Sequence, residues 1–337
     1  MPRKFLYSLH ALVENYGSNQ VTHLIGSGTG GWVVAGAITA GPTTNNLSSL
    51  ASNIQGSRVL YANYSGGGVV PLDYNGTTWV PGTLVPQGGG NCDAVAMSND
   101  GLHALSGGDY AGGVTPYEFN TESGLWEAQP IVSISDAHFN SVSMTRDGSR
   151  AIAVPKWDPY VYPLARDPGT GIWSVGSGIP LSGSTEKFFC SGISTSGNAA
   201  IVGSCYQGLP SDGLIWNGTT WDHVSIPVTL RSVCWRPDGL SAIGGGGEGE
   251  PGVIRTVNFD PATNTFSPGQ TITGFNAIVS VTIANDGIGN TALASDFYNN
   301  TVTPLSYSIV TGLWTAGTPI TSTSFANPWN MLVFPIW

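Results

Sequence analysis

Short alternating runs of apolar and polar residues recur along the chain, separated by clusters of Gly, Asn, Asp and Pro. The unit between residues 91 and 133 shows the pattern clearly. Alternation predicts strands over residues 93–98, 103–107 and 114–120, and a fourth strand that begins at Leu125. Asp-Gly between apolar runs favours a hairpin, because Gly accepts a positive φ. Each unit is therefore predicted to hold four antiparallel strands, called A to D in chain order.

An aromatic residue stands at the predicted start of the D strand in each unit. These residues, called the aromatic ladder, are Trp32, Trp79, Trp126, Trp173, Trp221, Phe266 and Trp314. Successive members are 47, 47, 47, 48, 45 and 48 residues apart. A repeat of this length is typical of propellers, solenoids and repeat arrays, and four strands per repeat favour the propeller. Packing between neighbouring blades explains the ladder better than a platform for a ligand does.

The repeats predict an all-β, seven-bladed β-propeller with four antiparallel strands per blade, in a single domain over residues 1–337. The expected blades cover residues 1–41 together with 325–337, then 45–88, 91–133, 137–183, 188–228, 230–275 and 277–321. The first segment supplies only three strands, at residues 5–13, 20–25 and 32–38, and the last segment supplies one. We therefore expect a C-terminal strand to complete the first blade and close the ring.

The turn sequences carry a resemblance to a known class of repeat. The strings CWRPDG (234–239), AMSNDG (96–101) and SMTRDG (143–148) resemble the WD40-like and YVTN-type repeats of bacterial propellers. The resemblance covers the whole chain at the level of the repeat, although the Gly-His and Trp-Asp signatures of WD40 repeats are absent. It implies the fold, because these motifs describe turns and blade packing, and it implies little about activity.

Charge and composition narrow the range of partners. The net charge is −10, from 21 acidic and 11 basic residues. A nucleic-acid partner is not expected, because it would require a concentrated patch of Lys and Arg. Membrane insertion is not expected either, since no apolar stretch approaches the roughly 18 residues of a membrane-spanning helix. Low charge with much Gly, Thr, Ser and Asn resembles extracellular or virion-surface proteins, while a cytoplasmic location stays open.

The loops between the B and C strands repeat an aromatic residue beside a carboxylate or an amide. Aromatic rings stack on the C–H faces of sugars and oxygens accept hydroxyl hydrogen bonds, so several weak sites on one rigid ring would gain avidity. The candidate ligand-binding residues are Tyr16, Tyr64, Asp109, Tyr110, Trp157, Asp158, Tyr160, Tyr206, Asp296 and Phe297. The alternative is that these rings pack between blades and that the carboxylates satisfy loop amides.

Catalytic sequence motifs are absent: the chain has no G-x-S-x-G, H-E-x-x-H or P-loop sequence. No catalytic residue, metal site or cofactor is predicted on that basis. Asp93, Asn140 and Arg231 each precede a turn glycine by eight residues, which places them near the mouth of a central channel. Together with His138 they could form a polar pocket for general acid–base chemistry, or simply a solvated rim.

Two cysteines flank one predicted turn. Counting outward from the turn places Cys190 and Cys205 opposite each other on paired strands. They are candidates for a cross-strand disulfide, and the alternative is two buried thiols.

The leading expectation for function is a non-enzymatic binding or structural module, whose B–C loops recognise a glycan or a protein. One alternative is a self-assembling subunit of a virion or an extracellular filament, with copies of the chain as partners. The other is a lyase or hydrolase acting at the mouth of the channel.

Overall fold

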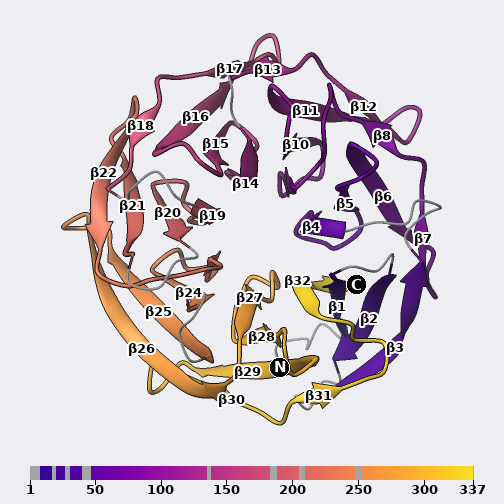
Figure 1. The fold of residues 1–337 in the computed structure, drawn as a ribbon, viewed down its shortest axis with the longest axis vertical. Coiled ribbons are helices and arrows are strands. Elements are labelled where there is room, and N and C mark those ends of the chain that lie inside the picture. Colours follow the sequence, from indigo (N-terminus) through magenta and orange to yellow (C-terminus); the bar gives the residue numbers. More distant parts are fainter. Residues whose placement is uncertain are drawn as a thin grey trace, which may run out of the picture.

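The computed structural model describes residues 8–16, 20–26, 31–39, 47–134, 138–182, 188–204, 209–246 and 252–336. Seven antiparallel sheets surround a central channel as the blades of a propeller (Figure 1). This confirms the all-β, seven-bladed architecture expected from the repeats. No helix that could cross a membrane occurs in the described ranges.

Each blade is a sheet whose A strand lies nearest the channel and whose D strand lies outermost. The A strands are β32 (Pro328–Ile336), β4 (Leu47–Ser52), β9 (Ala94–Met97), β14 (Phe139–Met144), β19 (Phe188–Ile193), β23 (Cys234–Trp235) and β27 (Ile278–Ile283). The B strands are β1 (Ser8–Asn15), β5 (Val59–Asn63), β10 (His103–Gly107), β15 (Arg150–Pro155), β20 (Ala199–Ser204), β24 (Ser241–Gly245) and β28 (Thr291–Asp296).

The outer strands follow in the same blade order. The C strands are β2 (Gln20–Gly26), β6 (Gly68–Tyr74), β11 (Gly113–Asn120), β16 (Tyr160–Arg166), β21 (Ser211–Trp216), β25 (Gly252–Asp260) and β29 (Thr301–Ser308). The D strands are β3 (Trp32–Thr39), β7 (Trp79–Pro81), β12 (Leu125–Ala128), β17 (Trp173–Val175), β22 (Trp221–Ile226), β26 (Thr265–Phe275) and β30 (Leu313–Ala316). Four two-residue strands pair farther along C strands, namely β8 (Val85–Pro86), β13 (Val132–Ser133), β18 (Ile179–Pro180) and β31 (Ile320–Thr321).

The first blade is completed from the far end of the chain, as expected. Its sheet has the order β3-β2-β1-β32, so the C-terminal strand takes the innermost place. Strands β1 and β32 are antiparallel, with Ser8 opposite Ile336 and Leu12 opposite Leu332. Backbone hydrogen bonds between the two ends of the sequence therefore close the ring.

The turns between A and B strands form as their sequences predict. Their glycines all have φ between 64° and 79°, and they are Gly56, Gly101, Gly148, Gly197, Gly239 and Gly287. At one of these turns the Asp100 carboxylate accepts a hydrogen bond from the Leu102 backbone N–H at 2.9 Å. Such side-chain acceptors stabilise the turn, which accounts for the recurrence of Asp before Gly.

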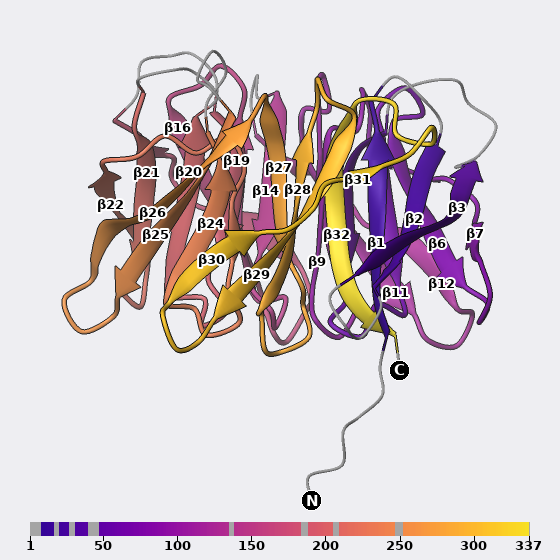
Figure 2. The same cartoon turned by 90° about the horizontal axis from the view of Figure 1, so that it is seen from below.

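The two ends of the blades differ in character (Figure 2). Those B–C loops and connections between blades that lie within the described residues gather at one end of the ring, called the loop face. The A–B and C–D turns gather at the other end, called the turn face. Strand β1 begins with Ser8 at the turn face, where it lies opposite Ile336.

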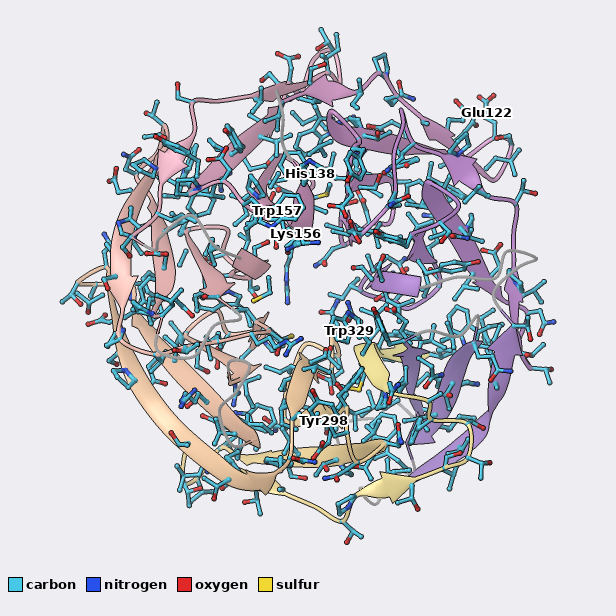
Figure 3. The ribbon with its side chains drawn as sticks, in the orientation of Figure 1. Glu122, His138, Lys156, Trp157, Tyr298 and Trp329 are labelled. Carbon is cyan, nitrogen blue, oxygen red and sulfur yellow. The ribbon has the colours of Figure 1, made fainter. Side chains whose placement is uncertain are left out.

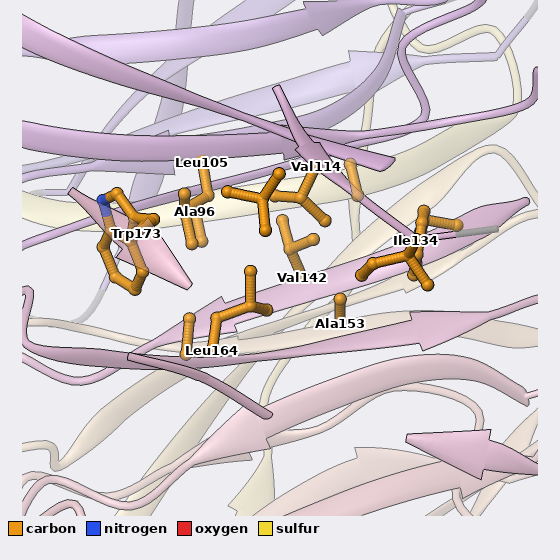
Figure 4. Packing of buried hydrophobic residues seen from close by; sticks show 12 residues of the cluster. Ala96, Leu105, Val114, Ile134, Val142, Ala153, Leu164 and Trp173 are labelled. Atoms are coloured by element: carbon orange, nitrogen blue, oxygen red, sulfur yellow. The ribbon is translucent and has the colours of Figure 1, made fainter. Parts of the chain in front are cut away.

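Seven hydrophobic clusters fill the spaces between blades, and each contains one member of the aromatic ladder. In one of them Trp173 packs with Leu105 and Val114 of the third blade and Leu164 of its own (Figure 4). Five ladder tryptophans are at most 7% exposed, while Trp32 and Phe266 are partly buried. The ladder therefore belongs to blade packing, as predicted.

Candidate functional site

The A strands enclose a cavity of about 570 Å³ that opens on the channel and receives residues from every blade. Much of its wall is neutral and polar, with the hydroxyl residues Ser48, Ser49, Ser141, Ser191, Ser232, Ser280 and Thr282. Two of these hydroxyls are linked, since the Ser191 Oγ lies 2.9 Å from Ser141 Oγ; it also lies 2.6 Å from the Oγ of Ser143 on the same strand as Ser141. Three charged side chains join this wall, namely Asp93, Lys156 and Arg231.

Asp93 lies immediately before β9, the A strand of the third blade. Burial, and to a smaller extent the nearby charge of Asp109, raise the pKa of its carboxyl to about 7, whereas Lys156 opposes the shift. The Asp109 backbone N–H donates a hydrogen bond to Asp93 Oδ2 at 3.1 Å, which also favours the ionised form. A carboxyl with this pKa exchanges a proton near neutral pH, as a general base or acid must.

Asp109 connects the groups around Asp93. Its side chain is buried, with Oδ1 3.3 Å from His138 Nδ1 and Oδ2 3.9 Å from Lys156 Nζ. The Tyr64 hydroxyl donates a hydrogen bond to Oδ2 at 3.5 Å. Two carboxylates, an imidazole and an ammonium group from the third and fourth blades are thus held together beside the cavity.

Aromatic side chains cover this group on the loop face. The His138 ring makes edge contacts with Tyr110, at 4.7 Å between centroids, and with Trp157, at 4.8 Å. The Lys156 ammonium lies 5.0 Å from the Trp157 ring centroid. Figure 3 shows His138, Trp157 and Lys156 on one side of the channel and Trp329 on the other. Tyr110 is 75% exposed and Trp157 is 48% exposed, so both rings are accessible to a solute.

A second aromatic group surrounds Trp329, on the closing strand β32. Its ring lies 5.1 Å from Tyr16 and 5.6 Å from Phe297. The Arg231 guanidinium carbon lies 5.3 Å from the Trp329 ring centroid, within the range of a cation–π contact. This contact orients a cation of the sixth blade at the wall of the cavity.

The structure brings six of the candidate loop residues into two groups. Tyr64, Asp109, Tyr110 and Trp157 come together around His138 and Lys156. Tyr16 and Phe297 join Trp329 instead. Their roles in binding a ligand stay predictions.

The other candidates have local surroundings or lie elsewhere. Asp158 accepts a hydrogen bond from the Tyr162 hydroxyl at 2.8 Å. Asp296 accepts backbone hydrogen bonds from Asn276 and Ala277, as a carboxylate that satisfies loop amides does. Tyr160, 40% exposed, is the first residue of β16. Tyr206 lies outside the described residues.

Asp93, Asn140 and Arg231 all line the cavity, in keeping with their predicted place at the channel mouth. Lys156 and Trp329 were not recognised as functional candidates from the sequence. Lys156 stands in the distinctive loop before Trp157, which is the one sequence feature that could have drawn attention to it. Trp329 has no such feature, because its place depends on the closure of the ring.

The proposed disulfide assumed that Cys190 and Cys205 lie opposite each other, and the strand register differs from this assumption. Cys190 lies opposite Gly203 rather than Cys205, with an irregularity in the ladder between Phe188 and Cys190. Cys205 itself lies outside the described residues, so the disulfide stays a prediction.

No family model matches the chain, and no curated protein matches it. Among solved structures, a candidate 6-phosphogluconolactonase from Bacteroides fragilis superposes with a TM-score of 0.80 at 13% identity, over 99% of each chain. A candidate 6-phosphogluconolactonase from Bacteroides uniformis gives 0.77 at 14% identity, over 97% of this chain and 99% of that one. A periplasmic gluconolactonase from Pseudomonas aeruginosa gives 0.73 at 14% identity, again over 97% and 99%. At these identities the similarity establishes a shared propeller fold.

These neighbours contradict the expectation of a non-enzymatic binding or structural module. Propellers that match the chain from end to end are named as lactonases, which are enzymes. The expectation rested on the absence of contiguous catalytic motifs. A site at the mouth of a propeller takes single residues from different blades, so no contiguous motif marks it. Self-association and a glycan or protein partner on the loop face stay predictions.

Proposed function

We propose that this protein is a hydrolase that opens a sugar lactone in the channel cavity. The observation that carries the proposal is the Asp93 carboxyl, whose pKa is raised to about 7 at the wall of a polar cavity that also contains Lys156 and Arg231. The names of the structural neighbours, 6-phosphogluconolactonase and gluconolactonase, support a lactone as the substrate class.

The cavity suits a molecule of this kind. Its volume of about 570 Å³ lies within the range of small-molecule sites. Serine and threonine hydroxyls on its wall can donate to and accept from the hydroxyls of a sugar ring. Trp329 lines the cavity and offers a flat apolar face for the C–H surface of the ring, while the half-exposed Trp157 lies across the channel from it (Figure 3).

The proposed reaction uses the Asp93 carboxylate as a general base. It takes a proton from a water molecule as the water oxygen attacks the lactone carbonyl carbon. Lys156 and Arg231 stabilise the negative charge that develops on the carbonyl oxygen. The bond between the carbonyl carbon and the ring oxygen then breaks, and the protonated Asp93 returns its proton to that oxygen. The product is an open-chain hydroxy acid, and the enzyme regains its starting state.

We extend the proposal to a site of action outside the cytoplasm. The Pseudomonas aeruginosa neighbour is named as periplasmic, and the low proportion of charged residues, 9%, agrees with exposure outside the cell. Fractionation of the native host, with the protein detected by antibody, tests this part independently of activity.

Hydrolysis of glucono-1,5-lactone and its 6-phosphate, followed as acid release in a pH-stat, tests the proposed reaction. The spontaneous rate is subtracted. We expect a clear acceleration with at least one substrate and a loss of about 100-fold or more in kcat for Asp93→Asn, the scale of general acid–base catalysis. Asp222→Asn, at an exposed aspartate on β22, is the matched control and should keep full activity. Wild-type rates equal to the spontaneous rate with both substrates would overturn the proposal, as would an Asp93→Asn variant with full activity.

A further inference from the structure

The fourth blade departs from a regularity of its neighbours. In five blades the C-strand residue directly opposite the ladder residue is aromatic, and these residues are Tyr74, Phe119, Trp216, Phe259 and Tyr307. Each ring lies 5.0–5.5 Å, between centroids, from its ladder partner. In the fourth blade this place belongs to Arg166, opposite Trp173. The first blade has Gly26 there, so the fourth alone has a cation in this position.

Arg166 forms an ion pair with the third blade. Its Nε lies 3.3 Å from Glu118 Oε1, and the other oxygen of Glu118 lies 2.5 Å from His103 Nδ1. The negative charge of Glu118 is thus shared between two donors. Among the described residues, none accepts a hydrogen bond from either Nη group of Arg166. The Nη groups of this planar guanidinium can therefore donate hydrogen bonds to the carboxylate of a ligand.

A cavity of about 550 Å³ is lined by the opposed pair Arg166 and Trp173 and also by Glu118, the ion-pair partner of Arg166. It lies on the outer side of the third and fourth blades, apart from the channel, and both Arg166 and Trp173 line it. Pro116, Pro130 and Ile131 of the third blade form apolar parts of its wall. Ile172, also in the wall, is 68% exposed, so the cavity is open to solvent.

We propose that this cavity binds a small aromatic carboxylate. The ring of the ligand would take the place that an aromatic side chain occupies in five other blades, against Trp173. Its carboxylate would accept hydrogen bonds from the Nη groups of Arg166. Proline and isoleucine side chains would cover the remaining faces of the ring. The site shares no lining residue with the channel cavity, so the inference does not depend on the proposed hydrolase activity.

Titration of the full-length protein with indole-3-carboxylate tests the proposal. Binding is followed by calorimetry and by the indole N–H resonance of Trp173, which is assigned with Trp173→Phe. We expect saturable binding that shifts this resonance, and an affinity at least about tenfold weaker for indole-3-carboxamide, which lacks the charge that pairs with Arg166.

Two variants locate the binding. Arg166→Phe restores the repeated aromatic pair, so it should fold, fill the cavity and abolish binding. Arg231→Gln removes an anion partner in the channel and should leave the affinity unchanged. The proposal is overturned if no saturable binding occurs at millimolar ligand, if Arg166→Phe binds as the wild type does, or if the loss of affinity follows Arg231→Gln instead.

Discussion

Replacement of Phe334 by alanine tests whether the closing strand stabilises the whole ring. Phe334 is fully buried on β32, and its ring lies 5.5 Å from that of Trp79. It packs in the cluster between the first and second blades, with Leu12 and Tyr61. Removal of a buried phenyl ring costs roughly 3–5 kcal/mol, because apolar contacts are lost and a cavity stays behind. Since domains are commonly stable by about 5–15 kcal/mol, this change would remove a large share of the free energy of unfolding.

Urea unfolding, followed by far-ultraviolet circular dichroism and by tryptophan fluorescence, measures the effect. We expect a lower midpoint for Phe334→Ala and a single transition by both probes, because each blade depends on its neighbours. Val310→Ala is the control; Val310 is 91% exposed and its loss should change stability by no more than about 0.5 kcal/mol. A cost below about 1 kcal/mol for Phe334→Ala would refute the reasoning from burial. A separate early transition of one blade would refute the role of closure.

Three further predictions concern titratable groups. Burial raises the pKa of Glu14, whose carboxylate oxygens have no hydrogen-bond partner within the described ranges. The folded state therefore keeps a proton that the unfolded state releases above about pH 4.5, so stability should fall as the pH rises from there. Glu14→Gln should remove that decline, and urea midpoints that fall equally in both proteins would count against it. Burial and the charge of His10 lower the pKa of His23 to about 4, so stability should be lost as pH falls from about 6.5 towards 4. His23→Gln should flatten this acid limb in thermal scans, and an unchanged limb would exclude His23 as its source. For lactone hydrolysis, kcat/KM should fall tenfold per pH unit well below pH 7, because the pKa of Asp93 is about 7; a rate independent of pH from 5 to 8 would exclude Asp93 as the base.

The sequence predicts the fold of this protein far better than its site. The ring and its closure follow from local patterns: the ladder recurs seven times, the turn glycine recurs six times, and the first repeat lacks one strand that the last segment supplies. The cavity wall has no such redundancy. Asp93 could be placed at the channel mouth by counting back from a turn, but its raised pKa comes from burial and from Asp109, sixteen residues away.

Other parts of the site depend on contacts that no local pattern encodes. Trp329 reaches the cavity only because β32 enters the first blade, where it meets Tyr16 from the other end of the sequence. The absence of an aromatic partner for Trp173 can be recognised only from the strand register, which shows that Arg166 occupies the position of an aromatic residue in five other blades. In both cases the informative comparison is between residues far apart in the chain.

The pairing of β1 with β32 also sets the order of events during synthesis. Strand β1 leaves the ribosome well before its neighbour β32, which is encoded roughly 300 residues later, so at about 5–20 residues per second β1 waits for tens of seconds with one edge unpaired. In that interval a neighbouring chain on the same messenger RNA can already have completed its own β32. That strand has the same sequence and can pair with the open edge of β1. Polysomes that translate this protein are therefore the place where an exchanged-strand dimer would arise, and the spacing of ribosomes would influence its yield.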